Sequence, residues 1–403
     1  MTPAGLAYLP TTPPTGCPFD PPEGLVRLRR EEPISRTALP DGSWAWLVTR
    51  HQDARAVLGD LRFSSDTTRP GYPLSGMTGG TPTAADRGFI RMDPPEHSRL
   101  RRMIMREFTV KRVEELRPDL QRITDELCDA MERSPERPVD LVRALALPMP
   151  SRVICVLLGV PGADHDLFQG FTSRLFSREV PEDVKAATRE EFNAYLEELT
   201  AAKAADPGDD ILSRLITGHE AAGELARKDV ATFGVLLLIA GHDTTANMIG
   251  LSALSLMDDP ELSGTLRRDP SLLPGAVEEL LRFHSIIRNG PRRVALEDVE
   301  VGGQVIRARE GVIVSVPAAN RDEDVFEDPD RFDIRRPGGR HHLAFGWGVH
   351  QCIGQALARA ELEIVVATLL RRFPRLRPAV PLEDLRFRTD QAIYGCHSLP
   401  VTW

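Results

Sequence analysis

Hydrophobic residues recur with helical spacing along most of the chain, and this pattern predicts a mainly helical protein. Between Pro95 and Leu281, apolar positions return every three or four residues, which is the period of one face of an α-helix. We expect interruptions where proline, glycine and aspartate cluster, at 148–150, 161–162, 207–208 and 258–260. Two further helices are predicted, a short one over His51–Leu58 and a long one over Gln355–Arg372.

Short apolar runs elsewhere predict a smaller β part. Between Val26 and Val48 such runs are broken by Pro33, Pro40 and Gly42, which favours a small hairpin. After Arg282 we expect short strands at Val294–Val301, Gln304–Ile306 and Val312–Val316, then an irregular charged segment over Asn320–Gly339. The expected fold class is therefore mainly α with a minor β part.

The segment Phe63–Ile90 is rich in glycine, proline, serine and threonine. A loop of this length is uncommon unless it is a lid, a binding loop or a disordered linker. Because regularly patterned sequence flanks it on both sides, we favour a ligand-access loop.

Composition limits the class of protein. A length of 403 residues by itself suggests two or three domains, and the net charge of −9 argues against nucleic acid as a partner. The five cysteines are scattered and form no C-x-x-C pair, which is typical of a reducing compartment. Residues 1–22 lack the features of a signal peptide, and the longest apolar run, Phe233–Ala240, is shorter than the ~18 residues of a membrane span. We therefore expect a cytoplasmic protein with no membrane contact.

The most informative segment is a glycine-rich stretch just ahead of the last predicted helix. It reads Phe345-Gly346-Trp347-Gly348-Val349-His350-Gln351-Cys352-Ile353-Gly354. Glycines allow positive φ angles and the close approach of a flat partner. Backbone N–H groups at a helix start favour the thiolate form of a nearby cysteine. A thiolate beneath a flat partner is what haem iron requires for O–O cleavage.

Polar groups follow an apolar run inside a second predicted helix, at about residues 225–257. The segment reads Ala240-Gly241-His242-Asp243-Thr244-Thr245, and the whole helix would be about 50 Å long. Buried polar groups are costly unless they are hydrogen-bonded. The segment is thus either a helix break, capped by Gly241 and by Asp243 or Thr244, or a functional site. Taken alone, the residues leave both interpretations open.

Several charged residues have ordinary interpretations when each is considered alone. Glu279 and Arg282 are three apart, as in a surface ion pair that contributes a few tenths of a kcal/mol. A solvated face is likewise the default for the basic cluster Arg99, Arg101, Arg102, Arg106, Lys111 and Arg112, and for His97, Arg293 and His342.

Together these motifs resemble the cytochrome P-450 monooxygenases, over roughly residues 26–403. Phe345, Gly348, Cys352 and Gly354 match the haem-loop pattern Phe-x-x-Gly-x-x-x-Cys-x-Gly, and Glu279-Leu280-Leu281-Arg282 matches the Glu-x-x-Arg hallmark. The similarity is closest to the actinomycete-type bacterial group that includes vitamin D and macrolide hydroxylases. It implies the P-450 fold in one domain over 1–403, with a proline-rich arm at 1–25 and a substrate-access loop at 63–90.

The resemblance implies a role for each candidate residue. Cys352 would be the axial thiolate ligand of haem b (iron protoporphyrin IX), while Gly241 would make room for dioxygen and Asp243 and Thr244 would govern proton delivery. A buried ionic triad would consist of Glu279, Arg282 and Arg336, with Arg335 as the alternative to Arg336. Haem contacts would come from His97, Arg101, Arg293 and His342 at the propionates and from Phe345, Gly346, His350 and Gly354 in the loop. Substrate contacts would come from Leu237, Ala240, Ile287, Arg288, Ile393 and Tyr394, besides the 63–90 loop and the stretch around 167–176.

The implied function is a monooxygenase that hydroxylates or epoxidises a bulky, mainly hydrophobic substrate. The resemblance also implies dioxygen as co-substrate, electrons from an acidic ferredoxin and its reductase, docking of that ferredoxin near the basic cluster, and a monomeric enzyme. The alternatives are a peroxide-driven peroxygenase, a non-catalytic haem sensor and a cysteine-nucleophile hydrolase. The acid–alcohol pair Asp243 and Thr244 favours oxygen activation over a peroxygenase or a haem sensor. A cysteine-nucleophile hydrolase would leave the glycine-rich loop unexplained. Trp347 departs from many family members, with a role in thiolate tuning or partner docking left open.

Overall fold

Helices form most of the chain in the computed structural model, which describes residues 6–10, 17–73, 88–176, 180–389 and 391–403. The chain divides into two compact units. Unit 1 consists of Met1–Arg99, Arg268–Gln355 and Glu383–His397, and unit 2 of Leu100–Arg267, Ala356–Leu382 and Ser398–Trp403. The expected class, mainly α with a minor β part, is confirmed.

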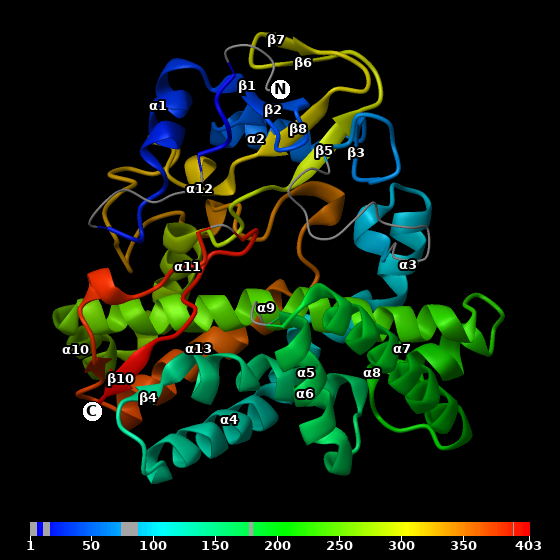
Figure 1. Cartoon of the computed structure of the whole chain (residues 1–403), viewed down its shortest axis with the longest axis vertical. Helices are drawn as coiled ribbons and strands as arrows, with labels where there is room; N and C mark the ends of the chain where they lie inside the picture. The colour runs from blue at the N-terminus through cyan, green and yellow to red at the C-terminus, as the bar shows by residue number, and fades with distance from the viewer. Residues whose placement is uncertain (1–5, 11–16, 74–87, 177–179, 390) are drawn as a thin grey trace. The chain divides into compact units, whose positions relative to one another are not determined.

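Unit 1 is built around a five-stranded sheet with strand order β1-β2-β8-β5-β3 (Figure 1). Its strands are β1 (Ile34–Ala38), β2 (Trp44–Val48), β3 (Phe63–Ser64), β5 (Arg292–Ala295) and β8 (Gly311–Val314), and a separate hairpin joins β6 (Val299–Val301) to β7 (Gln304–Ile306). The helices are α1 (Glu23–Glu31), α2 (His51–Gly59), α11 (Leu273–His284) and α12 (Val316–Ala319). Apolar side chains of β2, β8 and α2, such as Val48, Val314 and Leu58, form one buried core.

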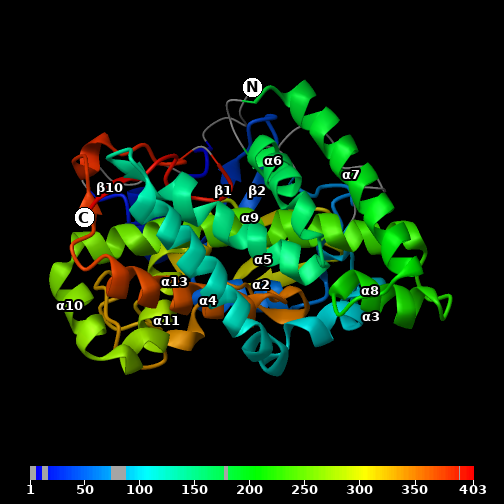
Figure 2. The same ribbon diagram turned by 90° about the horizontal axis from the view of Figure 1, so that it is seen from below.

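Unit 2 is a helical assembly around the 32-residue helix α9 (Arg227–Asp258). Figure 2 shows α5 (Pro148–Leu158) and α7 (Glu182–Ala205) beside it, consistent with their contacts with α9, and α6 (His165–Phe176) packs on α5 and α7. The other helices are α4 (Val110–Arg133), α8 (Ile211–Leu215), α10 (Pro260–Arg268) and α13 (Gln355–Arg372). A small sheet joins β4 (Val139–Asp140), β10 (Pro400–Thr402) and β9 (Arg377–Pro378). Helix α3 (Glu96–Met105) spans the boundary between the two units in sequence.

Most predicted helix boundaries are confirmed, with one exception at Gly241. The final helix covers Gln355–Arg372 as predicted, and the interruptions at 161–162, 207–208 and 258–260 are present. At 148–150 the boundary is also present, because the preceding π-helical turn ends at Ala146 and α5 begins at Pro148, whose first turn accommodates both prolines since no intrahelical N–H partner is required there. The break considered at Gly241 is wrong, since α9 continues through it.

The β predictions need three corrections. Only the later part of Val26–Val48 forms the hairpin, because residues up to Glu31 belong to α1, which buries Leu25 and Arg29 on one face. The expected strand Val294–Val301 is two strands, separated where Asp298 accepts bonds from Arg307 and the Ala308 N–H. The strand from Val312 ends at Val314, because Ser315 caps α12.

Two further sequence expectations concern the loop and the cysteines. Residues 74–87 of the predicted access loop lie outside the described residues, while β3 occupies its start. All five cysteines are free thiols. Within the described ranges, no helix is both long enough and apolar enough to span a membrane.

Candidate functional site

The Cys352 loop in unit 1 is a series of tight turns that lead into α13. The Cys352 N–H donates to the Phe345 carbonyl at 2.8 Å, and the Gly346 N–H donates to the Leu343 carbonyl at 2.8 Å. Gly346 and Gly348 have φ angles of 69° and 74°, which side chains strongly disfavour. Cys352 is half-buried, and α13 begins three residues later at Gln355, so the thiol lies near a helix start.

One side of this loop is open and another is tightly packed. A Cβ added to Gly346 or Gly354 would meet no atom within 4 Å. A Cβ on Gly348 would lie 2.4 Å from the Leu58 carbonyl oxygen, so only glycine fits against the end of α2. The loop therefore has room for a partner beside the cysteine while its backbone rests on unit 1.

The other cysteines have environments that disfavour a thiolate. Burial raises the pKa of Cys128 and of Cys155 to about 12, and burial also raises the pKa of Cys17. Cys396 is buried. Cys352 is thus the cysteine best placed to act as a ligand.

Glu279, Arg282 and Arg336 form a buried ionic cluster in unit 1. Arg282 donates from Nε and Nη2 to the two Glu279 oxygens, both at 2.8 Å. Arg336 Nε lies 3.2 Å from each of the same oxygens. The side chains of Glu279 and Arg282 are 1% and 0% exposed, so the surface-pair interpretation is wrong. Arg335, the alternative to Arg336, is exposed.

This cluster is connected to the segment that enters the Cys352 loop. Arg282 Nη1 donates to the carbonyls of Asn320 (2.9 Å) and Pro329 (2.8 Å). The Asn320 side chain accepts from the Leu343 N–H at 2.7 Å and donates to the Ser285 hydroxyl at 2.8 Å. Asn320 is fully buried and joins α11 to Leu343, two residues before Phe345. No sequence signal singled out Asn320, because its partners are distant in the chain.

Three of the four residues predicted to contact the haem propionates are buried or half-buried cationic or imidazole side chains. Arg293 is buried, its Nη1 donates to the Arg292 carbonyl at 2.7 Å, and desolvation lowers its pKa. Within the described residues, no carboxylate forms an ion pair with Arg293. His97 is buried with its ring centroid 4.1 Å from that of His350, and Arg101 lies half-buried one turn further along α3.

His342, the fourth residue predicted at a propionate, already has a partner at each ring nitrogen. His342 Nε2 lies 3.0 Å from Glu278 Oε2, and its Nδ1 accepts from the Ala344 N–H at 3.2 Å. Because Nδ1 accepts, the ring proton is on Nε2 and points at Glu278. His342 thus has no remaining donor for a propionate, and its contacts fix the loop entrance.

The polar residues of α9 lie on an unbroken helix in unit 2. Asp243 is buried, and Asn247 Nδ2 donates to its carbonyl (2.7 Å) and to its Oδ1 (3.1 Å). The Thr244 hydroxyl donates to the Ala240 carbonyl at 2.7 Å and is half-buried. A Cβ on Gly241 would lie 3.4 Å from Ile154 of α5, which is an ordinary contact. Asn247 was missed in the sequence, although its position four residues after Asp243 on a helix is the signal that would have found it.

The predicted substrate contacts divide into accessible and buried residues. Ile287 and Ile393 form a β-bridge and are half-buried, and on α9 Ala240 is exposed while Leu237 is buried. Arg288 and Tyr394 are 4% and 1% exposed, and the Arg288 guanidinium lies 3.9 Å from the Tyr394 ring centroid. The Tyr394 hydroxyl donates to the Pro18 carbonyl at 2.8 Å. Arg288 and Tyr394 are therefore packed inside unit 1, and their role as substrate contacts stays a prediction.

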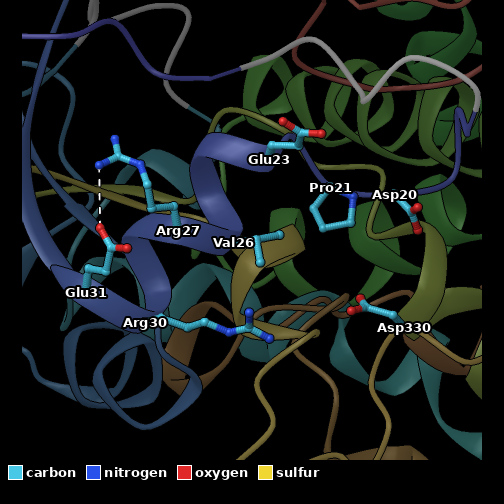
Figure 3. Close-up of a pocket in the computed structure, with 8 residues that line it drawn as sticks. All are labelled: Asp20, Pro21, Glu23, Val26, Arg27, Arg30, Glu31 and Asp330. Atoms are coloured by element: carbon cyan, nitrogen blue, oxygen red, sulfur yellow. Dashed lines mark ion pairs between the residues drawn. The ribbon is translucent and has the colours of Figure 1, made fainter.

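A surface hollow of about 490 Å³ in unit 1 is not this site (Figure 3). It is lined by Asp20, Pro21, Glu23, Val26, Arg27, Arg30, Glu31 and Asp330. Several of these charges are already paired, as in Arg27 with Glu31 at 3.6 Å and Arg30 with Glu323 at 2.9 Å. Its lining contains none of the residues predicted for catalysis.

Comparison with known proteins gives consistent matches. A family model described as Cytochrome P450 matches residues 165–385. Cytochrome P450-SU2 of Streptomyces griseolus is 50% identical over 402 residues, covering 100% of this chain and 98% of the relative. Vitamin D3 dihydroxylase of the same species is 46% identical, covering 96% of this chain and 95% of the relative. The crystal structure of cytochrome P450 MoxA from Nonomuraea recticatena aligns with a TM-score of 0.94 at 48% identity, covering 99% of each chain.

Proposed function

Because the chain belongs to the cytochrome P450 family, we propose that it uses dioxygen and two ferredoxin-derived electrons to hydroxylate or epoxidise a bulky, mainly hydrophobic compound. Family membership makes the protein a monooxygenase with haem held by a cysteine thiolate. The Cys352 loop is the observation that supports Cys352 as the haem ligand, because the loop is open beside the cysteine and packed closely against α2.

The residues of unit 1 fit a haem. Cys352 would supply the axial thiolate, and the N–H groups at the start of α13 would stabilise its charge. The bare faces of Gly346 and Gly354 leave space for a flat ring. Arg293 is a buried cation without a carboxylate partner in the described chain, so a propionate would complete its environment. Haem bound in this way activates dioxygen for insertion of one oxygen atom into a C–H or C=C bond.

Asp243 and Thr244 would move protons during the reaction. Reducing one oxygen atom of dioxygen to water consumes two protons, which must reach the site in the correct order. The Thr244 hydroxyl oxygen keeps acceptor capacity while its proton binds the Ala240 carbonyl, and rotation of the side chain would free the donor. Asp243, held by Asn247, would pass protons to Thr244 from solvent.

We infer a bulky, hydrophobic natural product or xenobiotic as the substrate. The accessible candidates for substrate contact are Ala240, Ile287 and Ile393, and all three are apolar. Contact with them would therefore favour a substrate with an apolar surface. The name of the vitamin D3 dihydroxylase, a relative that covers nearly the whole chain, gives independent support. A screen of macrolide, terpenoid and polyketide compounds for substrate-binding spectra would identify candidates.

We infer an acidic ferredoxin, with its reductase, as the electron donor to a monomeric, cytoplasmic enzyme. Within the basic cluster, Arg99 pairs with Glu96 at 2.6 Å, and Arg112 pairs with Glu115 at 2.9 Å. Arg102, Arg106 and Lys111 are exposed, and no described carboxylate forms an ion pair with them. These three unneutralised cations in a chain of net charge −9 would attract an acidic partner.

A coupling experiment distinguishes this function from its alternatives. With a compound from the screen, Thr244→Ala should still consume reductant and dioxygen but release hydrogen peroxide in place of product. Thr244→Ser keeps the hydroxyl and should keep the coupling. Asp243→Asn should slow turnover by ~10²–10⁴ without loss of substrate binding. The measurements are reductant consumed, peroxide released and product formed.

Three outcomes would count against the proposal. Wild-type coupling in Thr244→Ala would remove this residue from proton delivery. Product formed from hydrogen peroxide at full rate without ferredoxin would indicate a peroxygenase. Haem binding without product from any compound would favour a sensor.

A further inference from the structure

Trp347 occupies an unusual position in the Cys352 loop. It stands between Gly346 and Gly348, whose φ angles of 69° and 74° turn the chain sharply on both sides of it. Its side chain is 38% exposed, so this large aromatic residue is only partly buried. A core-packing role therefore does not account for a tryptophan at this position.

The Trp347 ring lies against one face of α2. The Arg55 guanidinium carbon is 3.9 Å from the ring centroid, which is a close cation–π contact. A Cβ built on Gly59 would lie 3.5 Å from ring atoms Cδ1 and Nε1. Arg55 and Gly59 are four residues apart on α2 and so share one helix face. The ring thus contacts α2 along a full helical turn.

The Arg55 guanidinium contacts the Trp347 ring and does not pair with a carboxylate of the described chain. Arg55 is exposed, and within the described residues it forms no ion pair. Its contact with the ring is therefore not a by-product of charge pairing with a neighbouring acid. Next to Trp347, Gly348 also fits closely against the Leu58 carbonyl.

The contact with α2 lies close to Cys352 along the backbone. The Cys352 N–H donates to the carbonyl of Phe345, which is two residues before Trp347. On the other side, the His350 ring lies against that of His97, with the centroids 4.1 Å apart and the ring planes tilted by 44°. Two ring contacts therefore hold the loop, one at Trp347 just before its 3₁₀ turn (Gly348–His350) and one at His350, the last residue of that turn, and Cys352 follows His350 by two residues.

We propose that Arg55 and Trp347 form a clamp that positions the Cys352 loop on α2 and thereby holds the sulfur in its ligand geometry. Both are positioning residues, since they act through the loop backbone. The haem part of this proposal rests on the proposed function, whereas the loop-ordering part concerns the protein alone.

The clamp can be tested with a matched pair elsewhere in unit 1. Arg36 lies over Trp44 in the same manner, 4.4 Å from its ring centroid, and is also exposed. Arg55→Gln and Trp347→Leu should each speed hydrogen exchange of the Cys352 amide in haem-free protein by about 2- to 30-fold, the range set by a cation–π contact. Arg36→Gln should leave that amide unchanged. Trp347→Phe keeps a ring and should fall between Trp347→Leu and wild type.

The haem-loaded protein gives a second readout. In the reduced, carbon monoxide-treated state, Arg55→Gln and Trp347→Leu should move part of the protein from the far-red-shifted Soret band of a thiolate-ligated haem to an ordinary band, and Arg36→Gln should not. Exchange rates and spectra equal to those of Arg36→Gln would overturn the clamp. Slower reduction by ferredoxin with unchanged exchange and spectra would also overturn it, and would make Trp347 a docking contact.

If wild-type protein itself lacked the far-red-shifted band, the proposed function would fail. The exchange measurement on haem-free protein would still decide the clamp. Failure of the clamp and failure of the proposed function are therefore distinguishable.

Discussion

Two glutamates, one in each unit, are buried to a similar degree but in opposite electrostatic settings. Glu279 of α11 is 1% exposed and accepts hydrogen bonds from Arg282, Arg336 and the Asp333 N–H. Glu361 of α13 is 3% exposed, and its Oε2 has no hydrogen-bond partner in the described structure. Desolvation raises the pKa of Glu361 to about 8.

The difference indicates which buried charges organise the candidate site. A carboxylate surrounded by two guanidinium groups is fixed in place, and through Arg282 and Asn320 it fixes the entrance to the Cys352 loop. A carboxyl group without a cation becomes neutral at pH 7, which avoids the cost of a buried charge. The paired glutamate is therefore a structural element of unit 1, and we expect the unpaired one to make the stability of the protein depend on pH.

The largest expected effect is that of Glu279→Ala. Removing this carboxylate leaves Arg282 and Arg336 as uncompensated buried charges, which typically costs ~3–5 kcal/mol. Against a total stability of ~5–15 kcal/mol, we expect little soluble, haem-loaded protein. The measurements are the yield of haem-loaded protein and the free energy of unfolding.

The matched control for Glu279→Ala is Asp119→Ala. Asp119 and Arg122 have the same three-residue spacing at 3.0 Å but are 44% and 53% exposed. This change should cost only ~0–1 kcal/mol. Equal effects of the two substitutions would show that burial of the Glu279 cluster carries no special cost.

Glu361→Gln should change how the stability of the protein depends on pH. The folded-state pKa of Glu361, about 8, lies above the usual glutamate value of 4.5. Its stabilising contribution is thus fully present below the unfolded-state pKa and is lost as pH rises through the folded-state pKa. Between these values the wild type should lose up to about 1.4 kcal/mol per pH unit relative to Glu361→Gln, which stays neutral.

Urea unfolding of wild type and Glu361→Gln at several pH values measures this difference. Glu363→Gln, two residues along the same helix, provides the control. Glu363 is paired with Arg117 at 2.7 Å and should keep the wild-type dependence on pH. Parallel stability curves for wild type and Glu361→Gln would contradict a neutral Glu361.

The smallest expected effect concerns charges that are exposed instead of buried. Arg102→Glu should leave stability unchanged but slow reduction by an acidic ferredoxin by up to about tenfold, because steering is lost. Wild-type reduction should also slow with added salt, since screening at 0.1 M acts over ~10 Å. Stopped-flow reduction rates measure both effects.

The same charge reversal at Arg133 controls for net charge. Arg133 is exposed at the far end of α4, about 33 Å along the helix from Lys111. Reduction rates that respond equally to Arg102→Glu and Arg133→Glu, or that ignore salt, would exclude a docking role for the basic cluster.

The sequence predicted local features better than distant contacts. Helical periodicity located α9 and α13, and the family resemblance implied Arg336, with Arg335 as the alternative, as the partner of Glu279. It did not reveal that His342 contacts Glu278, since the two residues lie 64 positions apart in the chain. It also did not show that Arg288 and Tyr394 pack inside unit 1, because burial depends on contacts with distant residues such as Pro18. Residues 74–87, where the access loop is predicted, remain a sequence-based expectation.

The most direct test of the account is the carbon monoxide difference spectrum of reduced wild-type and cysteine-substituted protein. Cys352→Ser and Cys352→His should abolish the far-red-shifted Soret band, because the thiolate that causes it is lost. Serine at Cys17, Cys128, Cys155 or Cys396 should preserve the band. A band that survives in Cys352→Ser, or that disappears with one of the other four substitutions, would contradict Cys352 as the haem ligand.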